Sequence, residues 1–228
     1  MTILVCVTAA GKQPKITSRP FGELSTGEST TLYTITNRSG ASMQLLDYGA
    51  RIVSIMMPDR KGHNGDVVVG FGDIENFEKK DRFIGPVIGR FGNRINHAAF
   101  TLDGTRYELV ANEKLGGEPV QCHGGTMGFD RFVWDATPVK EDGRTGVKFH
   151  RISPDGEQGF PGTMDVNVTY WLTENNTVRV EYEATTDKPT VVNLSNHTYF
   201  NLKGNEGGYV MDHLLQVAAD TCIQNNAQ

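Results

Sequence analysis

The sequence predicts an all-β protein, a large antiparallel β-sandwich built as a single domain. Helical periodicity is almost absent, whereas apolar and polar residues alternate with period two in many short runs. Turn sequences rich in glycine, asparagine and aspartate separate these runs. The length of 228 residues, with 26 glycines and 38% hydrophobic residues, suits one sandwich with a core of its own.

The expected strands of the first half carry β-branched and apolar residues between turns. Residues 31–36 and 51–57 have this composition, and the turn sequence 37–40 follows the first of them. Residues 99–110 predict a hairpin, because Asp103-Gly104 stands between two alternating runs. We expect these strands to pair with their neighbours along the chain.

The second half contains the clearest alternation. Residues 164–172 place their apolar side chains on one face, and residues 177–184 repeat the pattern after a short polar turn, so antiparallel pairing is expected. Long glycine-containing stretches separate the strand groups at 85–97 and 112–130. Loops of that length inside a domain are usually functional or disordered.

Composition argues against several classes of function. The net charge of −5, without a lysine- and arginine-rich run between aromatics, argues against binding to nucleic acid. No apolar run reaches the roughly 20 residues that span a bilayer, so no membrane partner is expected. An apolar start without a preceding Lys or Arg favours a cytoplasmic location, with secretion or a periplasmic location left open.

The three cysteines, Cys6, Cys122 and Cys222, lie far apart and have no paired spacing. Neither a disulfide framework nor a zinc site is indicated, and we expect buried or free thiols and no metal.

The first polar cluster is GRFGNRI at residues 89–95, where glycines bracket two arginines and Asn93. It superficially resembles a phosphate-binding loop, but a dinucleotide fingerprint needs a helix after the glycines, and here a hairpin follows. A glycine-rich turn with solvated arginines is the competing interpretation.

Two histidines mark the other clusters. His123 precedes Gly124-Gly125, and glycines let a backbone approach a ligand closely. His197 lies in SNHTYFNL, residues 195–202, where neighbouring amides and a hydroxyl could fix its tautomer. Either histidine alone could be purely structural. Together with the Asn93-Arg94 pair and the flanking aromatics they suit a small polyhydroxylated ligand, since rings cover the C–H face of a sugar while Arg and Asn bind its hydroxyls.

In this order, GRFGNRI, then HGG with GFDRFVW, then NHTYFNL, the motifs resemble those of the galactose mutarotase (aldose 1-epimerase) family. Residues 46–62, 156–162 and 212–220 agree, and the resemblance extends from about residue 22 onward. It implies a β-sandwich whose concave face holds an aldose, such as galactose or glucose, and the interconversion of its α and β anomers without a metal or organic cofactor. On this basis residues 1–20 would be an N-terminal extension and 21–228 the sandwich.

The resemblance also implies roles for individual residues. His197 would be the general acid toward the ring oxygen, and His123 would bind the sugar beside it. Asn93 and Arg94 would hold hydroxyl groups, with Thr198 and Tyr199 lining the same pocket. A partner that transfers a proton in this way supplies on the order of 10²- to 10⁴-fold of rate.

One element of the family pattern has no counterpart in this sequence. The family's base is a glutamate in the C-terminal third, and after His197 the carboxylates Glu206, Asp212 and Asp220 fall in stretches that match non-catalytic segments. We therefore expect a truncated sandwich, about two-thirds of one, of doubtful activity by itself. A non-catalytic sugar-binding protein and a relative of hexose-6-phosphate epimerases are the alternatives. A monomer or weak dimer is expected for the complete protein.

Overall fold

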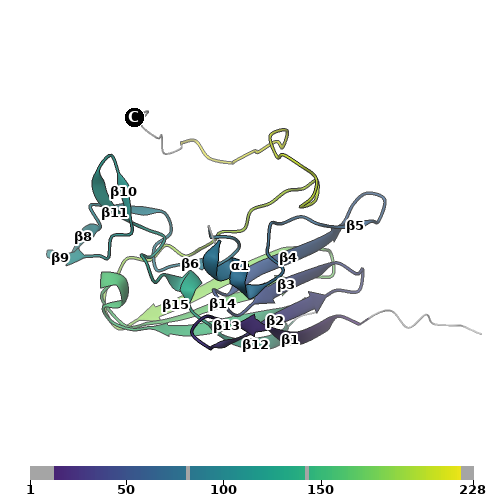
Figure 1. Cartoon of the computed structure of the whole chain (residues 1–228), viewed down its shortest axis with the longest axis horizontal. Helices are drawn as coiled ribbons and strands as arrows, with labels where there is room; N and C mark the ends of the chain where they lie inside the picture. Colours follow the sequence, from purple (N-terminus) through teal and green to yellow (C-terminus); the bar gives the residue numbers. More distant parts are fainter. Residues whose placement is uncertain (1–12, 81–82, 142–143, 222–228) are drawn as a thin grey trace, which may run out of the picture.

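Two antiparallel sheets packed face to face form the body of the protein, as the computed structural model shows for residues 13–80, 83–141 and 144–221 (Figure 1). The first sheet follows chain order and consists of β1 (Lys15–Glu23), β2 (Ser29–Thr36), β3 (Ser42–Leu46), β4 (Arg51–Pro58) and β5 (Asn64–Asp66). The second consists of β12 (Asp135–Glu141), β13 (Arg144–Ser153), β14 (Met164–Leu172) and β15 (Val178–Thr186). The predicted all-β sandwich is confirmed.

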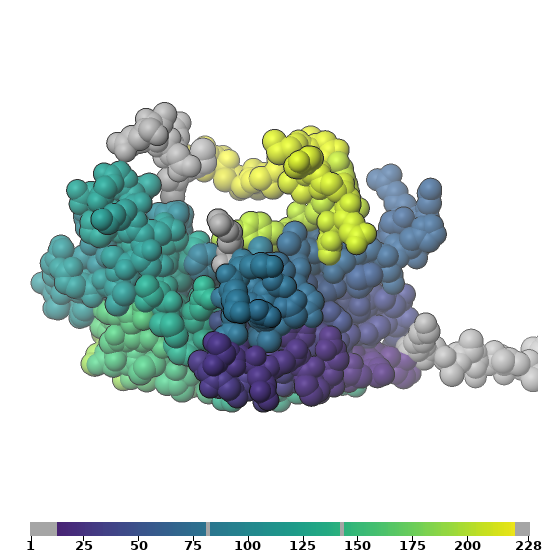
Figure 2. Space-filling view, viewed as in Figure 1, coloured from purple at the N-terminus to yellow at the C-terminus, as the bar shows by residue number. Residues whose placement is uncertain are grey.

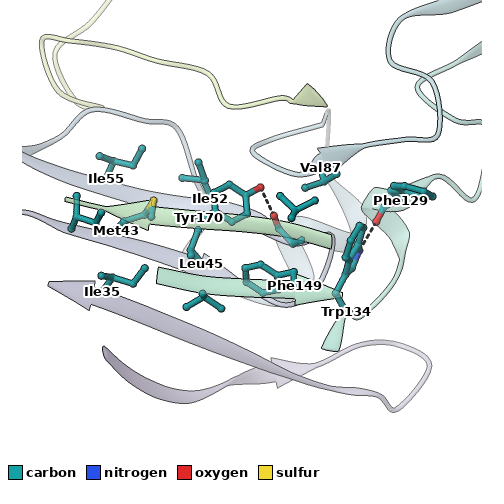
Figure 3. Close-up of a cluster of buried hydrophobic side chains, with 14 of the residues drawn as sticks. Ile35, Met43, Leu45, Ile52, Ile55, Val87, Phe129, Trp134, Phe149 and Tyr170 are labelled. Atoms are coloured by element: carbon teal, nitrogen blue, oxygen red, sulfur yellow. Dashed lines mark hydrogen bonds between the residues drawn. The ribbon is translucent and has the colours of Figure 1, made fainter. Parts of the chain in front are cut away.

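The core lies between these sheets and follows from the alternation in the sequence. On β14 every second residue from Met164 to Leu172 is at most 1% exposed. Figure 3 shows Phe149 and Tyr170 of the second sheet facing Leu45 and Ile52 of the first. Full burial of one such side chain contributes about 1.5–3 kcal/mol, so this layer is the main source of stability.

Strand β1 begins at Lys15, so the first sheet takes in residues 15–20, which the sequence placed in an N-terminal extension. The strand lies at the edge of the sheet and is mostly exposed, which leaves it without the alternation that would reveal it. Pro20 is compatible with this position, because an edge strand needs fewer N–H donors.

The remaining elements are short and lie outside the two main sheets. They are β6 (Val87–Ile88), β7 (Arg94–Asn96), β8 (Ala99–Leu102), β9 (Thr105–Glu108), β10 (Glu113–Leu115), β11 (Glu118–Cys122), β16 (Ser195–Asn196), α1 (Ile74–Lys79), η1 (Phe129–Arg131) and η2 (Glu157–Gly159). The predicted hairpin is β8–β9, with φ of 50° at Asp103 and 78° at Gly104, as a type I′ turn requires.

The stretches expected to be loops, 85–97 and 112–130, contain strands β6, β7, β10 and β11. Strands of two to five residues are too short for alternation to show. Strand β16 pairs with β6, and β10, β11 and β7 form a small sheet in that order. These pairings bring the three polar clusters to one end of the sandwich.

The six-residue helix α1 covers the outer face of the first sheet. Its Phe77 packs with Leu32, Leu46 and Tyr48, and the side chain of Asp73 caps it by accepting a hydrogen bond from the Asn76 N–H at 2.8 Å. Within the described residues, no helix has the length and apolarity needed to cross a bilayer.

Residues 187–221 leave β15 and run over the loops as a largely irregular segment, yellow toward its end in Figures 1 and 2. Main-chain hydrogen bonds from Asn201 to Val67 and from Asn205 to Asp66 fix its middle to the edge of the first sheet. Figure 2 shows open space beneath part of it. Its large apolar side chains point into solvent, namely Leu202, Tyr209, Met211, Leu214, Leu215 and Val217, at 66–101% exposure.

We predict that the 228-residue chain self-associates through this exposed segment, because apolar side chains gathered on a surface are stabilised by mutual burial. Leu214→Lys should shift the chain toward monomer in size-exclusion chromatography with light scattering. Gln216→Lys, which adds the same charge at an exposed polar position nearby, should leave the distribution unchanged. A chain that stays monomeric at high concentration would contradict this prediction.

Candidate active site

Three loops meet in a pocket of about 410 Å³, within the size range of small-molecule sites. Its lining consists of Ile88, Gly92, Asn93, His123, Asn193, Leu194, Ser195 and His197. The structure thus brings together Asn93, His123 and His197, which come from the three separate clusters of the sequence.

The glycine after His123 allows the second loop to dock against the first. Gly124 has φ of 89°, and a Cβ at this position would lie 1.8 Å from the carbonyl oxygen of Gly89. No other residue fits such an approach. The N–H of Phe129 donates to the same Gly89 oxygen at 3.3 Å, so the two loops share a backbone contact.

Arg90 anchors the first loop from inside the protein. Its side chain is 1% exposed, and its Nε donates to Ser153 Oγ at 2.9 Å. Its Nη1 donates to the Pro161 carbonyl, and its Nη2 donates to the carbonyls of Ser153 and Pro154, all at 2.8–2.9 Å. The loop that carries Asn93 is therefore fixed to the 153–161 segment, which overlaps the GEQGFPG sequence at residues 156–162.

The same loop also holds the segment that leads to His197. The Asn193 N–H donates to the Arg90 carbonyl at 2.9 Å, and the Gly92 N–H donates to the Asn193 carbonyl at 2.8 Å. The Asn193 side chain donates to the Gly92 carbonyl at 3.0 Å. Loop and segment are consequently joined where Gly92 and Asn193 line the pocket.

Asn93 and His123 bind each other reciprocally. The Asn93 N–H donates to His123 Nδ1 at 3.0 Å, and the His123 N–H donates to the Asn93 carbonyl at 3.0 Å. Both residues have left-handed backbone, with φ of 66° and 54°. Such strain persists only where the surroundings enforce it, and it gathers at functional sites.

The bond at Nδ1 determines which nitrogen of His123 carries the proton. Because Nδ1 accepts, the neutral ring is protonated at Nε2, which makes Nε2 a hydrogen-bond donor. Burial lowers the pKa of His123, and the nearby His197 and Arg94 lower it further. His123 is therefore suited to donate a hydrogen bond as a neutral ring at pH 7.

His197 is held by its backbone. Its N–H donates to the Pro86 carbonyl at 2.9 Å, and its own carbonyl accepts from the Gly85 N–H at 3.1 Å. The preceding Asn196 reaches into the core, where its amide donates to the hydroxyl of Tyr170 at 3.1 Å. The imidazole is left to face the pocket.

The two imidazoles lie edge to face, with ring centroids 5.1 Å apart. Phe83 packs beside both, at 4.7 Å from His123 and 5.8 Å from His197. The Tyr199 ring also contacts His197, with 5.1 Å between the ring centroids. Two groups that can transfer or share protons therefore stand within the reach of one small ligand.

Three of the expected site residues do not line the pocket. Arg94 forms an ion pair with Glu113, with 2.8 Å between Nε and Oε2, just outside it. Thr198 donates its hydroxyl and its N–H to the Asn196 side chain, and the Tyr199 carbonyl accepts from the Val69 N–H at 3.0 Å. Thr198 thus contributes to the shape of the 195–199 segment.

Sequence reasoning missed Asn193, Ser195 and Phe83. Asn193 could have been identified from the sequence, because it interrupts the apolar run 191–194 and a polar side chain there needs a hydrogen-bond partner. The contact of Phe83 with the imidazoles depends on its positive φ of 58°, which the sequence does not indicate.

Cys122 is a buried free thiol, as expected, and burial raises its pKa to about 11. Cys6 and Cys222 lie outside the described residues. In the described ranges, His, Cys, Asp and Glu form no group of three that could hold a metal ion.

A larger hollow, of about 640 Å³, lies on the outer face of β12–β15 around Lys148, Arg179 and Glu181. Its charged side chains pair with one another, as in the ion pair between Arg179 and Glu181 at 2.7 Å. We place the chemistry in the smaller pocket, because the histidines and the strained backbone are there.

A family model described as "Aldose 1-epimerase" matches residues 31–227. The chain is 38% identical to the galactose mutarotase of Homo sapiens over 208 residues, which cover 91% of this chain and 58% of that protein. It is 37% identical to the aldose 1-epimerase of Escherichia coli (strain K12) over 194 residues, covering 85% of this chain and 54% of that one.

Solved structures give the same result. The fold matches a galactose 1-epimerase from Lactobacillus acidophilus NCFM with a TM-score of 0.73 and 27% identity, covering 83% of this chain and 54% of that chain. A GalM/aldose epimerase homologue from C. elegans matches with a TM-score of 0.68 and 34% identity, covering 76% of this chain and 51% of that chain. The chain therefore spans somewhat more than half the length of these relatives.

We predict that Arg90→Met destabilises the fold by about 3 kcal/mol or more, because buried carbonyls lose a charged donor and are left unpaired. Arg106→Met removes an exposed arginine paired with Glu108 and should cost less than about 0.5 kcal/mol. Urea unfolding followed by tryptophan fluorescence measures both. Equal midpoints for the two variants would show that the Arg90 network adds nothing beyond a surface contact.

Proposed function

The chain belongs to the aldose 1-epimerase family, and on that premise we propose that it acts on an aldose such as galactose or glucose and interconverts its α and β anomers. The observation that carries the proposal is the pair of imidazoles 5.1 Å apart in one pocket, with the tautomer of His123 fixed by Asn93. The chain spans 58% of the human relative, so we propose this activity for the whole protein.

Anomer exchange needs one proton delivered and one removed. An acid protonates the ring oxygen while a base takes the proton of the anomeric hydroxyl, and the bond from C1 to the ring oxygen breaks. Rotation about C1–C2 in the open aldehyde is followed by closure on the other face. A positioned acid or base contributes on the order of 10²- to 10⁴-fold.

His197 is the acid in this scheme. Its backbone is clamped between Pro86 and Gly85, so the imidazole has a fixed approach to the pocket. Protonated, the ring donates to the ring oxygen as the C1 bond weakens. When the ring closes, the same nitrogen takes the proton back.

His123 binds the sugar rather than transferring a proton. Its lowered pKa keeps the ring neutral, and Nε2–H is the donor that remains after Nδ1 has accepted from Asn93. A neutral donor orients a sugar oxygen without competing for the proton that His197 delivers.

Asn93 and Arg94 complete the proposed binding set. The Asn93 side chain lines the pocket, and the guanidinium of Arg94 touches its Oδ1 at 3.4 Å. Arg94 offers several fixed donors to neighbouring hydroxyls but is a poor acid or base at pH 7. Tyr199 supports His197 by ring contact, and Thr198 supports it through the Asn196 turn.

No carboxylate lines the pocket among the residues that the structure describes. With no carboxylate among these lining residues, removal of the anomeric proton by water forgoes about 3–5 kcal/mol of barrier lowering. We expect sugar binding with only a weak acceleration of mutarotation by this chain.

We predict that His197→Asn abolishes the acceleration that the chain provides, because asparagine keeps a hydrogen bond but cannot deliver a proton. Polarimetry on freshly dissolved α-galactose measures the rate, with human galactose mutarotase as the positive control. His150→Asn changes a histidine on the outer face of β13 and should leave the rate unchanged. A His197→Asn variant that retains most of the rate would remove this residue from the acid role.

We predict that Arg94→Ala weakens galactose binding by about tenfold, equivalent to roughly 1.4 kcal/mol, and more than His123→Ala does. The guanidinium can serve two hydroxyls at once, whereas the imidazole offers one donor. Titration of the chain with galactose, followed by NMR, gives both affinities. Unchanged affinity in Arg94→Ala would favour a solvated turn arginine without a role in binding.

A further inference from the structure

Glu113 is carried to the edge of the pocket by a small sheet of its own. It opens β10, which pairs with β11, and β11 pairs with β7, where Cys122 lies opposite Arg94. Asn112 fastens the hairpin by accepting from the Cys122 N–H at 2.7 Å and donating to its carbonyl at 2.9 Å. The position of the Glu113 carboxylate is therefore set by paired backbone.

The carboxylate meets one side of the Arg94 guanidinium. Glu113 Oε2 accepts from Nε at 2.8 Å, and Nη1 reaches Asn93 Oδ1 at 3.4 Å. The side chains of Arg94 and Glu113 are 42% and 38% exposed, so the pair stands at the surface beside the pocket. Asn93 in turn bonds His123 in both directions.

We propose that Glu113 is a positioning residue of the sugar site, which holds Arg94 at Nε and directs its Nη groups toward Asn93 and a bound polyhydroxylated ligand. The inference rests on the proposed function, since it assigns Glu113 a part in binding that same ligand. Without the carboxylate, the long arginine side chain regains its rotamers, and the ligand must order it again at an entropic cost.

Glu113 also acts on His123 through its charge. The ionisable groups that influence His123 are His197, Arg94 and Glu113; the first two lower its pKa and Glu113 raises it. The neighbouring Phe83 ring carries no charge. Neutralising Glu113 leaves the Arg94 charge uncompensated, and this should lower the pKa of His123 further.

The first test measures galactose affinity by NMR titration of the full chain. We expect Glu113→Ala to raise Kd about fivefold, and Glu113→Gln about twofold, because an amide oxygen still accepts from Nε. Glu108→Gln is the matched control, since Glu108 binds Arg106 Nε at 2.7 Å in the next hairpin and does not line the pocket. The galactose Kd of Glu108→Gln should equal that of the unaltered chain.

Combining Glu113→Ala with Arg94→Ala separates positioning from general stability. If Glu113 acts through Arg94, its removal has no further effect once Arg94 is gone. An equal loss of affinity in both backgrounds would overturn the proposal. The proposal would also be overturned if Arg94→Ala weakened galactose binding and Glu113→Ala did not.

The second test needs no sugar. NMR titration of the His123 ring should give a lower pKa in Glu113→Gln and an unchanged pKa in Glu108→Gln, a difference that a merely structural role would not produce. An unchanged His123 pKa in Glu113→Gln would show that the carboxylate does not act on the site. If the unaltered chain fails to bind galactose, the proposed function falls, and this titration alone decides whether Glu113 acts on the pocket.

Discussion

The buried guanidinium of Arg90 is the interaction on which the candidate site depends. It spans from the loop of Asn93 to the carbonyls of the 153–161 segment, and its own carbonyl receives the Asn193 N–H. A cation at 1% exposure is tolerated only when its donors are satisfied, and here carbonyls and the Ser153 hydroxyl do so. One side chain thus joins two loops that lie about 65 residues apart in the sequence, and its hydrogen bonds restrain the loop that carries Asn93.

Backbone strain lies where the chemistry is proposed. Asn93 and His123 both have left-handed backbone, a conformation that costs about 1–3 kcal/mol for each residue. Their reciprocal hydrogen bonds and the docking of Gly124 on Gly89 hold them there. The strained arrangement presents Nε2 of His123 as a donor before any ligand arrives. Because the donor is oriented before binding, less conformational entropy is lost when a ligand binds.

Much of this protein could be predicted from local pattern. Asp103-Gly104 indicated the hairpin, and the alternation in 164–172 and 177–184 indicated the two most regular strands of the second sheet. The three polar clusters were found as motifs, and two histidines and Asn93 from them do line one pocket. Strand β1 was not predicted, because an exposed edge strand needs no alternation of apolar and polar residues. Strands β7, β10 and β11 were not predicted because they are too short to show a period.

By itself the sequence determined the fold class, the core faces of the long strands and which residue types could handle a proton, because these depend on residues near one another in the chain. Tertiary structure alone decided that Arg94 pairs with Glu113 beside the pocket rather than lining it, that Asn193 lines the pocket, and that His123 carries its proton on Nε2. These outcomes depend on distances between loops that are far apart in sequence, and such distances are set by the packing of the two sheets and by the Arg90 network.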